Sequence, residues 1–281
     1  MSSNVGVLYV VSTPIGNLSD ITQRAIDTLK EVAIVAAEDT RTSKKLLNLL
    51  GIKQSLIAYH EHNEQQQISA ITAYLDRGES VALVSDAGTP LISDPGYPLI
   101  SYLLRHDYRV IPIPGVSALI TALSVSGIAT DRFSFEGFLP AKSSARIKQL
   151  ERLKSETRTI VIFESCHRIQ HTLNDMSDVF GGERLVTVCR ELTKKFETIQ
   201  QDNLATLCSW IEQSNQQKGE FVLVVSGADK QKAYDSDSGR EILLVLLQYL
   251  GPSQAAAAAA QITGQKKKHM YELVLELKEE N

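Results

Sequence analysis

Two segments that can do chemistry follow short apolar runs in the N-terminal half of the chain. Ser85–Pro90 (S-D-A-G-T-P) follows the run Val81–Val84, and its small side chains leave backbone N–H and C=O groups uncovered around one acid. Glu38–Arg41 (E-D-T-R) follows Val32–Ala37 and can position a substrate or transfer a proton. Plainer alternatives stay open: an ordinary strand-to-helix connection for the first segment, and a capping acid with a surface ion pair for the second.

Two more turns rich in proline and glycine follow apolar runs. Ser12–Asn17 (S-T-P-I-G-N) follows Val7–Val11, and Pro114–Ala118 (P-G-V-S-A) follows Val110–Ile113. The carboxyl ends of parallel strands meet at one edge of a sheet, where open α/β sheets bind ligands. We therefore expect these turns and Ser85–Pro90 to form one binding site.

Metal and phosphate sites are disfavoured by the spacing of the residues that would form them. In His60–Glu64 (H-E-H-N-E) the histidines are two residues apart rather than four, so a polar loop bordering a ligand is favoured over a zinc motif. Cys166, Cys189 and Cys208 are widely spaced and indicate reduced thiols. The chain has no G-x-x-x-x-G-K-[ST] motif and no G-x-G-x-x-G after its first strand, which disfavours nucleoside triphosphate and dinucleotide cofactors.

The scaffold that positions these turns is an alternation of apolar strands and amphipathic helices. Strands are predicted at Val7–Val11, Val32–Ala37, Leu56–Tyr59, Val81–Val84, Val110–Ile113, Phe133–Gly137, Thr159–Phe163, Leu185–Cys189 and Phe221–Val225. Helices are predicted from Ile21 with Ser19 or Asp20 as cap, and at Lys44–Leu50, Ile68–Leu75, Leu99–Leu104, Ser144–Lys154, Ile169–Phe180 and Asn203–Trp210. Three further helices are expected at the end of the chain, at Glu241–Leu250, from a Ser253 cap to Ile262, and at Lys266–Leu277.

These elements predict an α/β protein with two α/β domains and a cofactor cleft between them. The N-terminal domain, residues 1–118, is expected to hold a mostly parallel sheet, and the C-terminal domain, residues 119–230, a mixed sheet. Residues 237–281 form a small helical appendage with the layout of a helix-turn-helix.

Composition indicates a soluble globular protein and excludes several classes. Of the 281 residues, 43% are hydrophobic and 22% charged, and no apolar run approaches the ~20 residues of a membrane span. With no basic segment of a signal peptide at its start, the chain is expected to be cytoplasmic. Its formal charge of −4 gives no overall attraction to nucleic acid, so such binding needs a local patch or a partner.

Eight motifs in fixed order resemble the tetrapyrrole methylase superfamily of S-adenosylmethionine-dependent enzymes. They are the segments 12–17, 38–41, 85–96 and 114–118, followed by F-S-F-E-G-F-L-P (133–140), F-E-S-C-H-R (163–168), R-E-L-T-K-K-F-E (190–197) and G-E-F-V-L-V-V (219–225). Within the superfamily, the chain resembles the branch that methylates a cytidine ribose 2′-hydroxyl of small-subunit (16S) ribosomal RNA. One departure is Cys166, which stands where a proline is usual in that branch and affects no catalytic position.

The resemblance implies a set of site residues. S-adenosylmethionine is expected to contact Pro14, Asp86, Ala87, Gly88, Thr89, Gly115, Ser117, Ala118 and Glu164. The ribose hydroxyl is expected to lie among Glu38, Asp39, Arg41 and Lys194, because a weakly acidic hydroxyl needs a base or a cation near the developing alkoxide. Lys194 can equally be structural, bonded to Glu191 or Glu197.

The substrate implied is small-subunit ribosomal RNA, free or in the assembled subunit, and the resemblance also implies a homodimer. RNA contacts are expected from Lys142–Arg158, which has six basic residues, and from Lys266–Lys268, with the cleft rim near Arg41, Arg168 and Arg190 as the alternative. A solvated helix face is the plainer interpretation of the first patch, and packing or dimerisation that of the second. Two other functions stay open: a methylase of a tetrapyrrole or other small substrate, and an RNA-binding module without cofactor.

Overall fold

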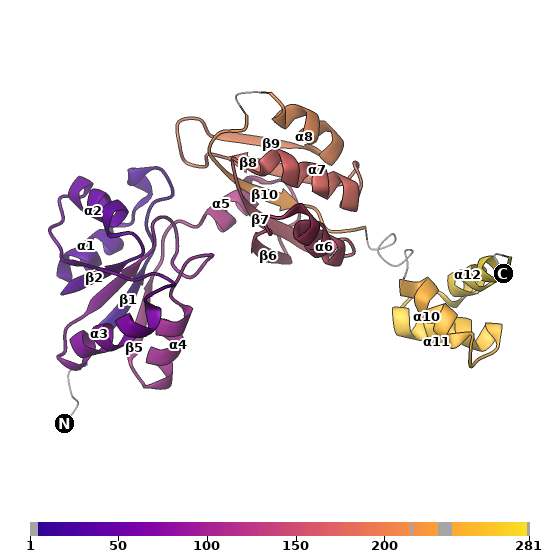
Figure 1. Cartoon of the computed structure of the whole chain (residues 1–281), viewed down its shortest axis with the longest axis horizontal. Helices are drawn as coiled ribbons and strands as arrows, with labels where there is room; N and C mark the ends of the chain where they lie inside the picture. The colour runs from indigo at the N-terminus through magenta and orange to yellow at the C-terminus, as the bar shows by residue number, and fades with distance from the viewer. Residues whose placement is uncertain (1–4, 214–215, 230–237, 280–281) are drawn as a thin grey trace.

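The structure is a computed structural model that describes residues 5–213, 216–229 and 238–279. Within those residues the strands form two five-stranded sheets, and helices pack around them (Figure 1). The first sheet is wholly parallel, the second is mixed, and three helices end the chain. The predicted fold class is therefore confirmed. The predicted boundary between residues 230 and 237 lies outside the described residues.

The first sheet has the strand order β3-β2-β4-β1-β5. Its strands are β1 (Val7–Val11), β2 (Ile34–Ala37), β3 (Leu56–Ala58), β4 (Val81–Val84) and β5 (Arg109–Ile113). The helices between them are η1 (Leu18–Asp20), α1 (Gln23–Glu31), α2 (Thr40–Leu49), α3 (Glu64–Asp76) and α4 (Tyr97–Arg105). Val81 and Leu83 pack against α3 and α4, whereas Ala82 and Val84 pack against α1 and α2. Because both faces are buried, β4 is an unbroken apolar run.

The four predicted helix starts in this half are two to four residues off: α3 begins at Glu64 rather than Ile68, and α4 at Tyr97 rather than Leu99. Helix α1 begins at Gln23 rather than Ile21, because Thr22 is the cap, its hydroxyl accepting from the Ala25 N–H at 3.1 Å. Helix α2 begins at Thr40, four residues before the predicted start, because the Asp39 carboxylate accepts from the Arg41 N–H at 2.7 Å. The first turn of α2 carries no apolar side chain, so periodicity does not reveal it.

The second sheet has the order β6-β7-β10-β8-β9, with β6 and β7 parallel and the other pairs antiparallel. Its strands are β6 (Phe133–Phe138), β7 (Thr159–Ser165), β8 (Leu185–Arg190), β9 (Thr198–Asn203) and β10 (Glu220–Val225). Helices α6 (Ser143–Leu153), α7 (Ile169–Phe180) and α8 (Leu204–Ile211) cover one face, and α5 (Ala118–Val125) packs on the other. Strand β9 is absent from the predicted strands, because its sequence T-I-Q-Q-D-N is polar; it pairs with β8 at the edge of the sheet.

The last three helices, α10 (Ser238–Leu246), α11 (Pro252–Thr263) and α12 (Lys267–Glu279), pack on one another around a core of their own. Small side chains such as Ala255 and Ala259 are fully buried there, so the helix backbones approach closely. Ser253 is not the cap of α11: Gly251 occupies that position and Pro252 is the first helical residue. Gly264 ends α11 at a φ of 71°, which confirms the predicted turn.

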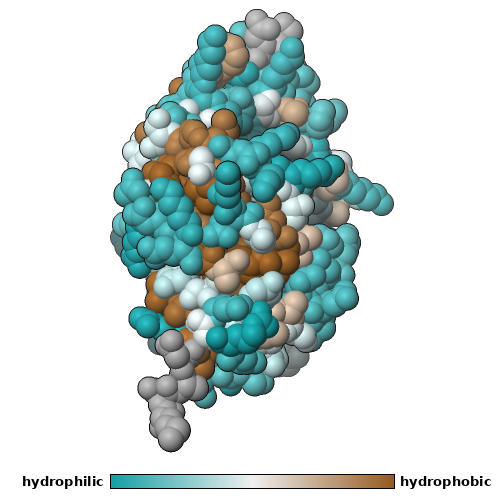
Figure 2. Space-filling model, turned by 90° about the vertical axis from the view of Figure 1, so that its left-hand side faces the viewer, coloured by the Kyte–Doolittle hydropathy of each residue, from teal (hydrophilic) through white to brown (hydrophobic). Residues whose placement is uncertain are grey.

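The surface beside the first sheet is mostly hydrophilic, with hydrophobic patches between polar side chains (Figure 2). Exposed apolar residues such as Leu49 and Tyr97, each 72% exposed, belong to this half of the chain. Among the described residues, no helix has the length and hydrophobicity needed to span a membrane.

Candidate functional site

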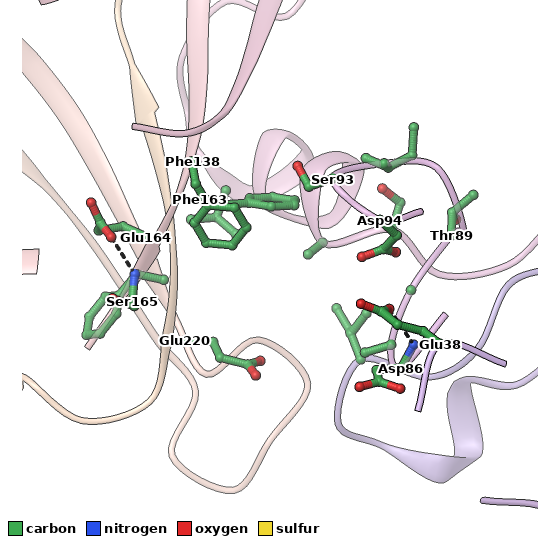
Figure 3. Close-up of a pocket in the computed structure, with 18 residues that line it drawn as sticks. Glu38, Asp86, Thr89, Ser93, Asp94, Phe138, Phe163, Glu164, Ser165 and Glu220 are labelled. Atoms are coloured by element: carbon green, nitrogen blue, oxygen red, sulfur yellow. Dashed lines mark hydrogen bonds between the residues drawn. The ribbon is translucent and has the colours of Figure 1, made fainter. Parts of the chain in front are cut away.

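A pocket of about 430 Å³ lies between the two sheets, within the size range of small-molecule sites. Figure 3 shows Glu38, Asp86 and Asp94 on one side of it, and the phenyl rings of Phe138 and Phe163 with Glu164 and Glu220 on the other. The first sheet contributes residues that follow its strands: Ile15, Glu38, Asp86, Ala87, Gly88, Thr89, Ile92, Ser93, Asp94, Ser117 and Ala118. The second sheet contributes Phe138, Phe163, Glu164, Ser165, Glu220, Phe221 and Val222.

The acidic wall consists of Glu38, Asp86 and Asp94 (Figure 3). Burial raises the pKa of Glu38, and the nearby charges of Asp86 and Glu61 raise it further against a backbone hydrogen bond from Asp86. Burial is also the main cause that raises the pKa of Asp86, and it raises the pKa of Asp94 to about 6. Three carboxylates that repel one another, with no buried cation beside them among the described residues, form a site for a positively charged group.

The turns behind this wall are tied to one another. Thr13 and Gly88 exchange two backbone hydrogen bonds, of 2.8 and 3.0 Å, and thereby join the ends of β1 and β4. The Thr89 hydroxyl lies 2.9 Å from that of Ser12 and donates to the Val116 carbonyl at 3.0 Å. The three predicted turns therefore form one fixed surface.

The backbone after β4 is strained where it borders the pocket. Leu91 and Ser93 have φ values of 74° and 70°, which non-glycine residues rarely adopt. Such strain costs roughly 1–3 kcal/mol per residue and persists where the surrounding structure fixes it, most often at functional sites. Asp94 is not among the predicted site residues, although it lies within the motif 85–96, four residues after Pro90.

Aromatic rings form the opposite wall. The ring of Phe163 meets those of Phe135 and Phe138 edge to face, at centroid distances of 4.8 and 5.8 Å. Phe138 is 53% exposed although it is apolar, which leaves a phenyl surface available to a flat ligand. Neither Phe138 nor Phe163 is among the predicted site residues. Both lie in motifs that carry the family resemblance, 133–140 and 163–168, and these motifs could have identified them.

Glu164 lines the pocket, but its carboxylate is already bonded. Its side chain is 0% exposed and accepts from the Arg168 guanidinium at 2.7 Å and from the Thr172 hydroxyl at 2.6 Å. It also accepts from the Ser165 N–H, and Figure 3 shows the carboxylate turned away from the acidic wall. Through its side chain, Glu164 fixes the end of β7.

Lys194 lies beside the pocket rather than in its wall. Its ammonium donates to Glu191 at 2.8 Å and to the pocket residue Glu220 at 3.0 Å, and its aliphatic chain lies against Gly16, where a Cβ atom would come within 2.4 Å of its Cγ. Partial burial alone would lower the pKa of Lys194, but the hydrogen bonds to the two glutamates raise it. Lys194 is thus held as a cation across the gap between the two halves.

The remaining predicted residues lie around this pocket. Ile15 lines it rather than the neighbouring Pro14, and Gly115 lines a second cavity with Ser117. At Gly115 a Cβ would lie 2.8 Å from that of Ser12, so only glycine permits this approach of the two turns. Several of the predicted site residues do line the first pocket: Glu38, Asp86, Ala87, Gly88, Thr89, Ser117 and Ala118.

Asp39 and Arg41 lie outside the pocket lining and bond each other. Their side chains form an ion pair of 2.7 Å, with the Arg41 side chain 87% exposed. The hydrogen bond from Arg41 is the largest cause that lowers the pKa of Asp39 to about 2. Asp39 and Arg41 therefore fit the plainer interpretation of this segment, a helix cap with a surface ion pair. Glu38, in contrast, faces the pocket.

Two residues of the expected RNA surfaces are buried. Arg146 is 2% exposed and forms an ion pair of 2.6 Å with Asp175, so it is not part of a solvent-facing patch. Arg190 is 9% exposed and donates to the Lys218 carbonyl at 2.6 Å. Sequence alone treats arginine as a surface residue, but a guanidinium can bind several carbonyls and an acid inside the protein. Lys142, Lys148, Arg152 and Lys154 remain exposed.

Metal-binding clusters of three or more His, Cys, Asp or Glu side chains are not found in the described part of the chain. The three cysteines are free: Cys189 is buried, and Cys166 and Cys208 are partly buried.

Comparisons with known proteins agree with this architecture. The family model described as Tetrapyrrole (Corrin/Porphyrin) Methylases matches residues 7–208, and the RsmI C-terminal HTH domain matches residues 233–278. A relative from Pasteurella multocida named ribosomal RNA small subunit methyltransferase I is 48% identical over 98% of this chain and 99% of its own length. The Vibrio cholerae protein of the same name is 50% identical over 96% of this chain and 94% of its own.

Solved structures show the same fold at low sequence identity. Diphthine synthase has a TM-score of 0.63 at 13% identity, covering 82% of this chain and 94% of its own. Cobalt precorrin-4 methyltransferase has a TM-score of 0.58 at 16% identity, covering 78% and 94%. The fold, the family model and the full-length relatives together place this chain in the tetrapyrrole methylase family, in the group of ribosomal RNA small subunit methyltransferase I.

Proposed function

We propose that this protein is an S-adenosylmethionine-dependent methyltransferase that methylates the ribose 2′-hydroxyl of a cytidine in small-subunit ribosomal RNA. The observation that carries the proposal is the match to proteins named ribosomal RNA small subunit methyltransferase I. The matches cover nearly the whole chain, and about half of the aligned residues are identical. The C-terminal match extends the similarity beyond the methylase fold. The low-identity structures support only the fold.

The pocket residues fit the cofactor. Its positive charge suits the wall of Glu38, Asp86 and Asp94, whose pKa values are raised first by burial and further by the negative charges of their neighbours. The exposed phenyl surface of Phe138 suits an adenine ring. When bound, S-adenosylmethionine supplies an electrophilic methyl group.

The chain's own residues must orient the ribose and receive its proton. Among the four residues proposed for this task, Glu38 lines the pocket, and burial raises its pKa toward the range useful for proton transfer. Lys194 is held as a cation by Glu191 and Glu220, so its role is electrostatic rather than that of a base. Arg41 lies outside the lining with an exposed guanidinium, which suits an RNA phosphate, and Asp39 holds it in place.

Further parts of the proposal concern the assembly. We propose a cytoplasmic homodimer of three-part chains, with residues 1–118 and 119–230 forming the methylase and residues 237–281 contacting RNA or packing. Linked copies of a basic surface would bind the small subunit with a higher effective concentration than one copy. Sedimentation at several protein concentrations tests the dimer.

The function is tested by methyl transfer. Purified protein is mixed with S-adenosylmethionine labelled in its methyl group and with either small ribosomal subunits, their free RNA, or a porphyrin precursor. We expect label in the RNA, on the 2′-oxygen of a cytidine, so that the phosphodiester bond on its 3′ side resists alkaline cleavage. Label only in the tetrapyrrole, or no affinity for the cofactor in calorimetry, would overturn the proposal.

A further inference from the structure

The loop that joins β3 to α3 lies beside the candidate site but outside the lining of its pocket. Strand β3 pairs with β2, and the Tyr59 N–H donates to the Ala37 carbonyl at 2.8 Å, one residue before Glu38. On its other side, Glu64 accepts from the Gly96 N–H at 3.0 Å, two residues after Asp94. The loop is thus tied to the chain segments that carry two of the three acids of the pocket.

The conformation of this loop is fixed by its own hydrogen bonds. The Asn63 side chain accepts from the His60 N–H at 2.9 Å and donates to the Ala58 carbonyl at 3.0 Å. Tyr59 is fully buried, and its hydroxyl donates to Glu64 at 3.2 Å. A polar loop held this firmly presents its exposed side chains in a defined direction.

Those exposed side chains include an imidazole ring with no structural task among the described residues. His62 is exposed, and the partly buried His60 meets it edge to face at a centroid distance of 6.0 Å. The Nδ1 atom of His60 is buried, and no described residue gives it a hydrogen-bond partner. Buried polar atoms without partners are rare in folded proteins and call for an explanation.

The chemistry of the proposed substrate gives the exposed His62 ring a task, with the His60 ring packed edge to face against it. A ribose that enters the pocket carries its nucleobase with it, and a base reached in this way must leave its stack in the RNA. Proteins stabilise such unstacked bases on aromatic or imidazole rings. The phenyl rings line the pocket itself, whereas His62 directly follows Glu61 on the loop. Burial is the first cause that raises the pKa of Glu38, and the charges of Asp86 and Glu61 raise it further, so the loop lies near this wall of the pocket.

We propose that His62 stacks on the nucleobase of the target nucleotide and that His60 is a positioning residue that supports the His62 ring. This inference rests on the proposed function, because it identifies the part of the protein that holds the base. It assigns a role to the H-E-H-N segment, which resembles a metal motif but has the wrong spacing.

The test compares His62→Ala, His62→Phe and His62→Gln in methyl transfer to small ribosomal subunits. Loss of base stacking costs roughly 5- to 150-fold, so we expect His62→Ala to lower kcat/KM for RNA by that factor. His62→Phe should restore most of the loss because it keeps a flat ring, and His62→Gln should not. Affinity for S-adenosylhomocysteine in calorimetry should stay unchanged in all three variants.

The matched control is His106→Ala. His106 also stacks on a neighbour, Tyr102, at 4.0 Å, but it follows the C-terminal end of α4 and so lies at the opposite edge of the first sheet. This variant should methylate RNA at the wild-type rate. The supporting role of His60 is tested by a double-mutant cycle: His60→Ala should lower kcat/KM in the wild-type background and have little further effect beside His62→Ala.

Several results would overturn the inference. They are a kcat/KM within twofold of wild type for His62→Ala, rescue by glutamine but not by phenylalanine, or fully additive effects of the His60 and His62 variants. Failure of the proposed function looks different, because wild-type protein would then transfer no methyl group to RNA.

Discussion

The two walls of the pocket treat their charged side chains in opposite ways. On the first sheet, Glu38, Asp86 and Asp94 face the pocket with no ion pair in the described part of the chain, and the pKa of each is raised. On the second sheet, Glu164 is fully buried and bound to Arg168. Parallel strand ends thus leave carboxylates without a salt bridge, whereas on the mixed sheet Glu164 holds the end of β7 and the exposed Glu220 pairs with Lys194.

The largest expected effect concerns the second wall. Glu164→Gln removes the charge that a half-buried Arg168 needs, and breaking a buried ion pair costs about 3–5 kcal/mol. We expect a loss of about 3 kcal/mol in urea unfolding. Glu220→Gln is the control, because the Glu220 side chain is 80% exposed and its ion pair with Lys194 should contribute less than about 1 kcal/mol. Equal losses in the two variants would break the comparison.

The next effect concerns ligand affinity at the first wall. Asp86→Asn keeps an oxygen that can accept from the Asp39 N–H, at 3.1 Å in the wild type, but removes the negative charge. Cofactor binding measured by calorimetry should weaken by roughly 1.5–3 kcal/mol, as for a hydrogen bond to a charged group. Asp76→Asn, which removes a charge bonded to Tyr108 at the end of α3, should leave that affinity unchanged. A normal affinity of the Asp86 variant would exclude this carboxylate from the site.

A smaller effect is expected from Asp94, through pH. Its pKa is raised to about 6 by burial first and by the charges of Glu38 and Asp86. A carboxyl whose folded pKa is raised stabilises the protein below its unfolded pKa, near 3.9, and this contribution is lost as the pH rises through 6. Asp94→Asn should therefore stabilise the protein at pH 7 by about 1–2 kcal/mol, after allowance for partial exposure, and by nothing near pH 4. Denaturant unfolding at four pH values measures the difference; a pH-independent one would contradict it.

The smallest effect concerns helix α6, which carries exposed basic side chains and one buried, paired arginine. Lys148 and Arg152 are exposed, whereas Arg146 is buried against Asp175. Replacing Lys148 and Arg152 with Gln should make the slope of log K for RNA binding against log salt concentration shallower, by about 0.7–0.9 for each phosphate that is no longer neutralised. The stability of the protein should not change. Arg146→Gln should instead destabilise the fold and serves as the contrast. An unchanged salt slope in the double variant would place the RNA on another surface.

The sequence predicts the strands well because both sheets have at least one buried face. Val81–Val84 and Phe221–Val225 are apolar runs that no surface element would carry. Prediction from sequence fails where an element is defined by hydrogen bonds rather than by a pattern of hydrophobic residues. The cap at Thr22, the early start of α2 and the polar edge strand β9 depend on contacts between side chain and backbone or between strands.

The site shows the same division. Small residues after strands identify Asp86–Thr89 and Ser117, because parallel strand ends converge on one edge. Asp94 could not be identified in this way, since it faces the pocket only after the strained backbone at Leu91 and Ser93 turns the chain back. The burial of Arg146 and the bonds of Glu164 likewise depend on partners about thirty and eight residues away in the chain.

Helix α5, which packs on one face of the second sheet, makes Cys189 a reporter of local opening. The thiol is fully buried against Leu119 and Leu123 of α5, and burial first, then the charge of Glu197, raises its pKa to about 12. A thiol reagent therefore reaches it only after α5 leaves the sheet, because a protonated and covered thiol does not react. The labelling rate of Cys189 thus measures how often α5 leaves the second sheet, and a ligand that contacts Ser117 and Ala118 at the start of α5 should slow it.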